Sequence, residues 1–381
     1  MTSRRKQPQV LTRKQLSRRE REERQKRTLY ILVGLAGAAM VLILGFGAYQ
    51  EYVVRPSSPV AVVNGTVIPT RDYQLRVKYR RFELANQVAM LQTQLARLDP
   101  TKEDEQFLVQ YLQQQVQQVQ SQSIVLPTQV LDDLVDEVLV QQEATRRGIA
   151  VDSAGVQEEI ERLFGFERNP ATPEPTPTVT EGQETPTPMP TVDRVSQQDF
   201  EKEYGEYVLA LRSEVGMSEP AFRSLFEKDL LRRKVEEVFA EEVATVDEQV
   251  HALHILVETE EEALGVLDRL AAGEDFGILS DELSLDTATE GGDLGWFPRG
   301  MMVPEFEEVA FGLGVGDISD PVETSFGYHV IQVLDREAGR PLDEAVLEQR
   351  KSAALSEWLA EARRADTVER YWSSDKVPAA A

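Results

Sequence analysis

The sequence predicts an α+β protein with a membrane-anchor helix, a mostly helical domain and a smaller domain of short strands and helices. Three observations support this fold class. Residues 29–50 form an apolar run without a single charged residue. Apolar residues then recur at helical spacing through most of residues 57–246. From residue 250 onward the pattern changes to short β-like runs separated by glycines. A chain of 381 residues is long enough for two or three such domains.

The N-terminus combines a basic tail with the apolar run. Residues 1–28 contain 11 Lys and Arg residues against 3 Asp and Glu residues. The following run, residues 29–50, is long enough to cross a bilayer, which takes about 20 residues. It exceeds the apolar core of a cleavable signal peptide, about 7–15 residues, and no small-residue cleavage site follows it. Because basic flanks favour the cytoplasm, we expect an uncleaved, single-pass anchor in the cell membrane, a cytoplasmic tail and an extracytoplasmic body.

The overall composition excludes several classes of function. The net charge is −25, and the acidic excess lies entirely outside the basic tail. An acidic body repels phosphate backbones, so we expect no nucleic-acid partner. The chain has no cysteine, which excludes disulfides, thiolate metal sites and cysteine nucleophiles. It has only three histidines, so a histidine-rich metal site is not expected.

Residues 57–168 are predicted to form the first part of the helical domain. Asn64-Gly65 between two β-rich pieces is typical of a tight hairpin. A long helix is expected over roughly residues 70–123, with an interruption near Asp99-Pro100. A strongly amphipathic helix then runs from Pro127 to Arg147.

Three further segments complete the part of the chain outside the strand-rich domain. Residues 169–194 contain seven prolines and seven threonines, so we expect a disordered insertion that buries no core. Helical patterning resumes over residues 195–246, the second part of the helical domain. Residues 341–372 are predicted to form a helix whose apolar face, with Trp358 and Leu359, packs back on the earlier helices.

Polar and aromatic residues of chemical interest concentrate in short segments of residues 247–337. The first is the β-like run Val250-His-Ala-Leu-His-Ile-Leu-Val257. The second is Gly291-Gly-Asp-Leu-Gly-Trp-Phe297, followed by Met301-Met-Val-Pro-Glu-Phe306. The third is Pro321-Val-Glu-Thr-Ser-Phe-Gly-Tyr-His-Val-Ile331. In order and spacing, these segments resemble the parvulin family of peptidyl-prolyl cis/trans isomerases.

The resemblance implies a four-stranded antiparallel sheet wrapped by helices over residues 247–337. It places catalytic groups at four positions: His254, Asp286, Thr324 and His329. It also places the wall that receives the substrate proline ring at Leu294, Met302 and Phe306. No cofactor and no metal are implied. Two alternatives stay open from the residues alone: Asp281 could take the place of Asp286, and Met302 and Phe306 could be ordinary core. His251 matches no family position and is expected at the surface.

The N-terminal region resembles the SurA-like and PrsA-like foldases. The matching segments are an opening strand at residues 60–70 and a helix–glycine–helix pattern at residues 129–156. The resemblance implies a helical chaperone domain, and hence an extracytoplasmic isomerase and chaperone for newly secreted, unfolded polypeptides that contain X–Pro bonds. The acidic stretch Glu258–Glu262 predicts phosphate-independent activity, because it would repel a phosphorylated residue before proline. The alternative is a non-enzymatic, membrane-anchored holdase that uses the parvulin fold only to bind peptides.

Overall fold

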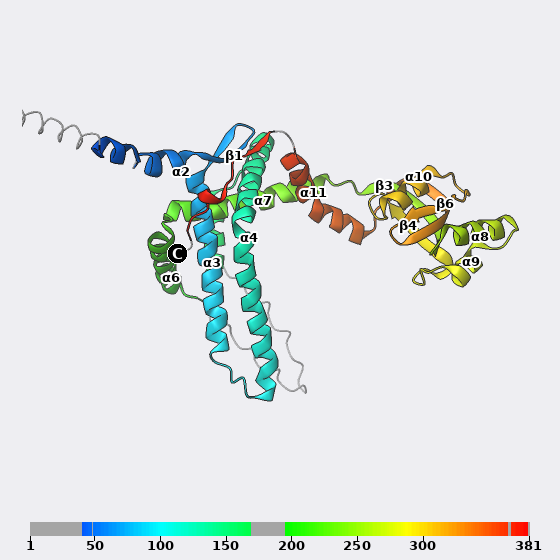
Figure 1. Cartoon of the computed structure of the whole chain (residues 1–381), viewed down its shortest axis with the longest axis horizontal. Coiled ribbons are helices and arrows are strands. Elements are labelled where there is room, and N and C mark those ends of the chain that lie inside the picture. The colour runs from blue at the N-terminus through cyan, green and yellow to red at the C-terminus, as the bar shows by residue number, and fades with distance from the viewer. Residues whose placement is uncertain (1–39, 48, 169–194, 365–366, 380–381) are drawn as a thin grey trace, which may run out of the picture. The chain divides into compact units, whose positions relative to one another are not determined.

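The structure is a computed structural model that describes residues 40–47, 49–168, 195–364 and 367–379 (Figure 1). The predicted basic tail (1–28), residues 29–39 and 48 of the predicted anchor (29–50) and the Pro/Thr-rich insertion (169–194) lie outside the described residues. Within the described part of the chain, no helix is both long and apolar enough to cross a membrane.

The chain divides into two compact units. The helical unit comprises the described residues up to Arg232 together with those from Glu361 onward, and the sheet unit comprises Arg233–Ala360. The elements of the helical unit are η1 (Gln50–Val54), α2 (Arg55–Ser57), β1 (Pro59–Val63), β2 (Thr66–Pro69), α3 (Thr70–Leu95), α4 (Glu103–Arg147), α5 (Ser153–Leu163), α6 (Gln197–Ala210), η2 (Leu211–Val215), the first part of α7 (Glu219–Glu242), β7 (Val368–Arg370) and η4 (Ser374–Lys376).

The helical unit opens with the predicted hairpin. β1 and β2 pair antiparallel through a turn in which both Asn64 (φ 49°) and Gly65 (φ 80°) are left-handed. This is the backbone that a two-residue primed turn requires. β7 pairs with the other edge of β1, so the C-terminal strand completes a three-stranded sheet of order β2-β1-β7.

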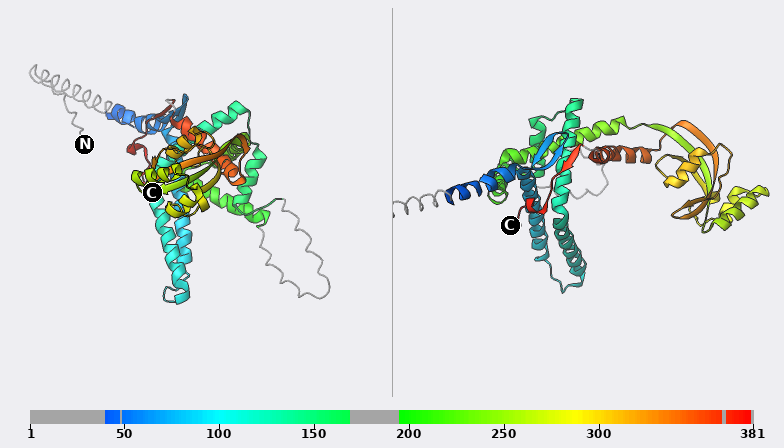
Figure 2. Two further views of the ribbon diagram at one scale, coloured as in Figure 1. Left: turned by 90° about the vertical axis from the view of Figure 1, so that its right-hand side faces the viewer. Right: turned by 45° about the horizontal axis from the view of Figure 1, so that its top comes forward.

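α3 and α4 lie side by side along most of their length, as the two views in Figure 2 show. The predicted helix start at Pro127 was wrong, because α4 continues unbroken from Glu103 through Pro127 to Arg147. Proline removes one helical hydrogen bond, a loss that packing can offset. Here Leu126 and Val130 are buried on either side of it, and the Tyr73 hydroxyl donates to the Pro127 carbonyl at 3.1 Å.

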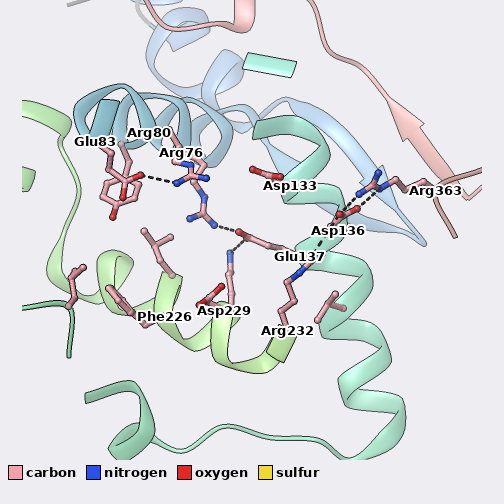
Figure 3. Close-up of a pocket in the computed structure, with 15 residues that line it drawn as sticks. Arg76, Arg80, Glu83, Asp133, Asp136, Glu137, Phe226, Asp229, Arg232 and Arg363 are labelled. Atoms are coloured by element: carbon pink, nitrogen blue, oxygen red, sulfur yellow. Dashed lines mark hydrogen bonds and ion pairs between the residues drawn. The ribbon is translucent and has the colours of Figure 1, made fainter. Parts of the chain in front are cut away.

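Charged side chains tie the helices of the helical unit together around a cavity of about 620 Å³ (Figure 3). Glu137 on α4 accepts from Arg76 on α3 and, at 2.8 Å, from Lys228 on α7. The buried carboxylate of Asp136 receives both arms of the Arg363 guanidinium. The last turn of α11 is thereby fixed to α4 by a bidentate pair, the strongest geometry for such contacts.

Both flanks of the insertion contribute to one aromatic cluster. Phe164, just after α5, lies 5.9 Å from the ring of Phe200 and 5.8 Å from that of Tyr204, both on α6. Val195 packs against the same cluster. The segments on either side of residues 169–194 therefore share one hydrophobic core.

The sheet unit consists of a four-stranded antiparallel sheet with helices on both faces, which confirms the predicted α+β class. The strand order is β4-β3-β6-β5. Its elements are the second part of α7, β3 (Val246–Val257), α8 (Glu260–Ala271), α9 (Phe276–Leu283), η3 (Glu290–Gly292), β4 (Asp293–Pro298), α10 (Pro304–Gly312), β5 (Val322–Thr324), β6 (Gly327–Pro341) and α11 (Glu344–Arg364).

Two buried clusters define the faces of this sheet. On one face, residues of α10 such as Phe306 and Ala310 pack on the central strands at Ala252 and Ile331. On the other face, α8 and α9 pack on the same two strands around Ile255.

The C-terminal helix is shorter than the predicted one (341–372), and it packs on an earlier helix, α7, as its apolar face predicted. α11 ends at Arg364, and its residues up to Ala360 belong to the sheet unit. There Leu355 and Leu359 are buried, and the Trp358 ring lies 5.4 Å from that of Phe239 on α7. The apolar face of α11 therefore packs against the neighbouring part of α7. The residues from Glu361 onward belong to the helical unit.

Candidate active site

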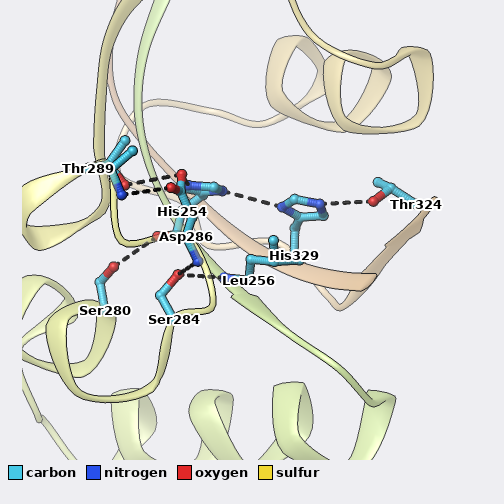
Figure 4. A network of polar contacts seen from close by, with 9 residues as sticks. His254, Leu256, Ser280, Ser284, Asp286, Thr289, Thr324 and His329 are labelled. Atoms are coloured by element: carbon cyan, nitrogen blue, oxygen red, sulfur yellow. Dashed lines mark hydrogen bonds and ion pairs between the residues drawn. The ribbon is translucent and has the colours of Figure 1, made fainter. Parts of the chain in front are cut away.

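Four predicted catalytic residues form one continuous hydrogen-bonded chain across the sheet unit (Figure 4). Asp286 Oδ2 lies 2.9 Å from His254 Nε2. The Nδ1 atoms of His254 and His329 are 3.3 Å apart. His329 Nε2 lies 2.9 Å from Thr324 Oγ1. The structure thus brings together residues that are up to 75 positions apart in the sequence.

Strand pairing explains how the two histidines meet. In the β3–β6 ladder, His254 is opposite Ile331 and Leu256 is opposite His329. The two imidazoles are therefore diagonal neighbours on the same face of the sheet, within reach of long side chains. Both are nearly excluded from solvent, with 5% and 6% of their surfaces exposed.

The partners of the histidines determine which ring nitrogens carry protons. The Asp286 carboxylate can only accept, so the Nε2–H of His254 donates to it, and Nδ1 of His254 is the atom that faces His329. His329 then donates its Nδ1–H to His254, and its own Nε2 accepts from the Thr324 hydroxyl. The Gly327 carbonyl, 3.2 Å from Thr324 Oγ1, is a second and more distant acceptor for the same hydroxyl proton.

Electrostatics favours the same arrangement. The Ala288 backbone N–H, together with His254 and Thr289, holds the pKa of Asp286 below its usual range despite partial burial. Burial, with a smaller contribution from the adjacent His254, lowers the pKa of His329 to about 4. At neutral pH the network therefore consists of one carboxylate and a neutral imidazole at His329.

A close backbone approach fixes the strand segment that carries His254. Gly292, with φ 75°, lies so close that a Cβ atom there would stand 2.3 Å from the His254 carbonyl oxygen and 2.6 Å from Ser280 Oγ. Ser280 in turn donates to that carbonyl at 3.2 Å. Only glycine combines the left-handed backbone with this contact. The Gly-Gly pair of the sequence motif thus has a packing role beside the site.

The three predicted substrate-binding residues lie in one hydrophobic cluster next to the imidazoles. Phe306 on α10 is 3% exposed, and its ring stands edge to face with those of His254 (6.0 Å) and His329 (5.3 Å). Leu294 and Met302 are partly buried and pack against the same cluster. The arrangement provides an apolar surface with a polar, water-poor wall beside it.

The two aspartates differ in their contacts, and the folded loop adds a residue that the sequence did not indicate. Asp281 accepts from the Gly291 backbone at 2.7 Å and takes no part in the histidine network. Thr289 contacts Asp286 at 3.3 Å, a role that only the folded loop reveals. His251, expected at the surface, is partly exposed and bonds through Nε2 to Asp293 at 2.7 Å.

Comparison with known families agrees with this geometry. Residues 238–337 match the family model described as the PPIC-type PPIASE domain. The sheet unit therefore carries a parvulin-type domain, as predicted.

Individual relatives extend the comparison. Foldase protein PrsA of Caldanaerobacter subterraneus subsp. tengcongensis is 42% identical over 139 residues, which cover 34% of this chain and 45% of that protein. Foldase protein PrsA of Halalkalibacterium halodurans is 56% identical over 90 residues, or 23% of this chain and 27% of that protein. A crystal structure of PrsA from Bacillus cereus is 24% identical, with 61% of this chain and 74% of that chain covered and a TM-score of 0.35. The chain thus spans less than half the length of these two curated relatives.

Proposed function

We propose that this protein is a peptidyl-prolyl cis/trans isomerase and chaperone for secreted polypeptides. The observation that carries the proposal is the Asp286–His254–His329–Thr324 chain of hydrogen bonds, aligned in one direction beside the Phe306 surface. Similarity to proteins named foldase, and to the PPIC-type domain, supports it. A holdase that only binds peptides would not require this network.

The chemistry of the reaction explains these residue types. An X–Pro bond rotates over a barrier of about 18–20 kcal/mol without breaking a covalent bond. The proline ring would sit on Leu294, Met302 and Phe306, which exclude water from the imide. The twisted carbonyl of the transition state would then face a polar wall whose protons are already in place. Such preorganised groups stabilise a transition state more than mobile water does.

The region before α8 supports phosphate independence. Glu258 and Glu260–Glu262 provide four carboxylates in a stretch of five residues, and no basic residue interrupts them. A phosphorylated residue before proline would meet like charge there. The substrates we propose are therefore unmodified X–Pro segments.

The full-length chain in non-ionic detergent is expected to accelerate cis/trans exchange of an unphosphorylated X–Pro peptide, measured by exchange NMR. Thr324→Val keeps the side-chain shape but leaves His329 Nε2 without a donor, which costs about 1–3 kcal/mol for a buried group. We expect kcat/KM to fall about ten-fold or more. Thr245→Val is the matched control, because Thr245 is exposed and outside the network. No acceleration by the folded wild-type chain would contradict the proposal.

The chaperone activity is assigned to the helical unit. Large apolar side chains stand open to solvent along α3 and α4, for example Met90 (57% exposed), Phe107 (79%) and Ile124 (80%). Exposed apolar surface of this kind is typical of sites that bind other chains. We propose that it holds extended clients.

We also propose that residues 29–50 anchor the protein in the cell membrane with the body outside. The support is the apolar run behind the basic tail. External protease on spheroplasts should remove everything after about residue 50 and leave the tail protected, as judged with antibodies to either end. Digestion of the tail with survival of the sheet unit would reverse the orientation.

A further inference from the structure

A groove of about 540 Å³ lies in the sheet unit, outside the histidine network. One wall is the solvent-facing side of α10, and the other is the segment that leads from Ile318 into β5. Four carboxylates line it: Glu305, Glu308, Asp320 and Glu323. We call it the acidic groove.

The carboxylates of the acidic groove lack counter-charges. In the described part of the chain, none of the four forms an ion pair or a side-chain hydrogen bond. Some other carboxylates of the same unit do have partners: Asp247 pairs with Arg350 at 2.8 Å, and Glu307 accepts from the Gly300 backbone at 2.9 Å. Four like charges around one hollow repel each other, and a cation placed among them would relieve that repulsion.

The floor between these carboxylates is apolar. Val309 on α10 and Leu313, the residue that follows this helix, are partly buried and rest on the core of the sheet unit. Ile318, which faces them across the groove, is 39% exposed. Lys and Arg side chains combine an aliphatic stem with a charged head, and they bind best where apolar surface and carboxylates adjoin. The groove has both.

The acidic groove shares two elements with the proposed proline site. On α10, Phe306 faces the imidazoles while Glu305 and Val309 line the groove. On β5, Glu323 lines the groove and the next residue, Thr324, bonds to His329. The negative charge also reaches the strand beside the site, because Glu323, with Glu260 beyond it, raises the pKa of the exposed Tyr328 hydroxyl. A peptide bound at the imidazoles would thus continue past these carboxylates.

We propose that the acidic groove binds a Lys or Arg side chain of the client polypeptide near the proline that is isomerised. The protein then selects basic, extended segments of unfolded chains over acidic ones. This inference rests on the proposed isomerase function and adds a substrate class to it.

The test uses one X–Pro peptide core with a single arginine moved stepwise along both flanks. The same positions carry citrulline, which keeps the shape without the charge, in the reference series. Binding to the full-length chain in non-ionic detergent is measured by fluorescence anisotropy, and exchange by NMR. At low salt, we expect arginine at one or two positions to bind about 3–10-fold more tightly than citrulline, an advantage that about 0.5 M salt should largely screen.

Two double variants decide whether the groove is responsible. Glu305→Gln with Glu323→Gln should bring the arginine-to-citrulline ratio close to one. Asp268→Asn with Glu357→Gln removes the same charge from exposed residues outside the groove and should leave the ratio unchanged. Equal binding of both peptides by the wild type, or an equal loss in both variants, would overturn the proposal.

The remaining outcomes separate the inference from the function on which it rests. If the protein catalyses exchange without any arginine preference, the isomerase proposal holds and the proposal that the groove binds a basic side chain fails. If arginine preference depends on Glu305 and Glu323 but no peptide is isomerised faster, the groove binds a basic side chain and the isomerase proposal fails. A concentration-dependent increase in mass that the groove variant abolishes would show a self-association surface, and would likewise overturn client binding.

Discussion

Replacing Phe306 with alanine is expected to destabilise the sheet unit by about 3–5 kcal/mol and to remove most of the isomerase activity. The ring is 3% exposed and contacts both imidazoles as well as Phe297, 6.2 Å away. Its loss would leave a cavity at the base of the proposed proline site. Urea unfolding gives the stability, and kcat/KM is measured at a temperature where the variant remains folded.

Phe311→Ala separates packing from catalysis. Phe311 belongs to the same buried cluster, is 5% exposed and stands edge to face with Phe297 at 6.0 Å. No ring contact joins it to either histidine in the described part of the chain. We expect a comparable loss of stability with activity largely retained. If folded Phe306→Ala were as active as Phe311→Ala, the ring would be core alone and the site assignment would fail.

The sequence predicted the sheet unit well because its signals are local and redundant. Short β-like runs and turn glycines indicated a strand-rich domain, and the resemblance of its ordered motifs to the parvulin family implied the four-stranded antiparallel sheet. The Asn64-Gly65 hairpin was predictable for the same reason, since the two residues alone favour the left-handed turn.

Features that depend on tertiary contacts could not be predicted from such local sequence signals. Pro127 predicts a helix start by its own chemistry, and only the burial of its neighbours and the Tyr73 contact show why α4 continues. The face of α11 is apolar in the sequence, but the sequence does not show that Phe239 on α7 meets it.

The aspartate of the site shows the same limit at the level of single residues. Asp281 and Asp286 are equivalent until the loop after α9 folds and turns one toward Gly291 and the other toward His254. Likewise, the sequence names the histidines but not the direction of their hydrogen bonds, which depends on the Asp286 contact.

Acidification from pH 6.5 to pH 4 is expected to destabilise the sheet unit by up to about 3 kcal/mol through His329 alone. In the unfolded chain this histidine takes up a proton near its usual pKa of 6.5, whereas in the folded unit its pKa is about 4. Between these values the unfolded state binds more protons, so stability rises with pH and levels off above 6.5. The lowered pKa of Asp286 acts in a separate window, because its contribution is lost only as pH falls below about 3.8.

The measurement is urea unfolding of residues 233–360 at several pH values, with ring NMR of the histidines. His329→Gln should flatten the slope between pH 4 and 6.5. His251→Gln is the control: it removes the partly exposed histidine that pairs with Asp293, and the slope should persist.

Since the chain has only three histidines, the His329 signal can be assigned by these variants. It should stay in its neutral form down to about pH 4, because protonation would break its bond from Thr324 and place charge in a buried site. Titration of that signal near pH 6.5 in the folded unit would contradict both the buried neutral network and the polar wall proposed for catalysis.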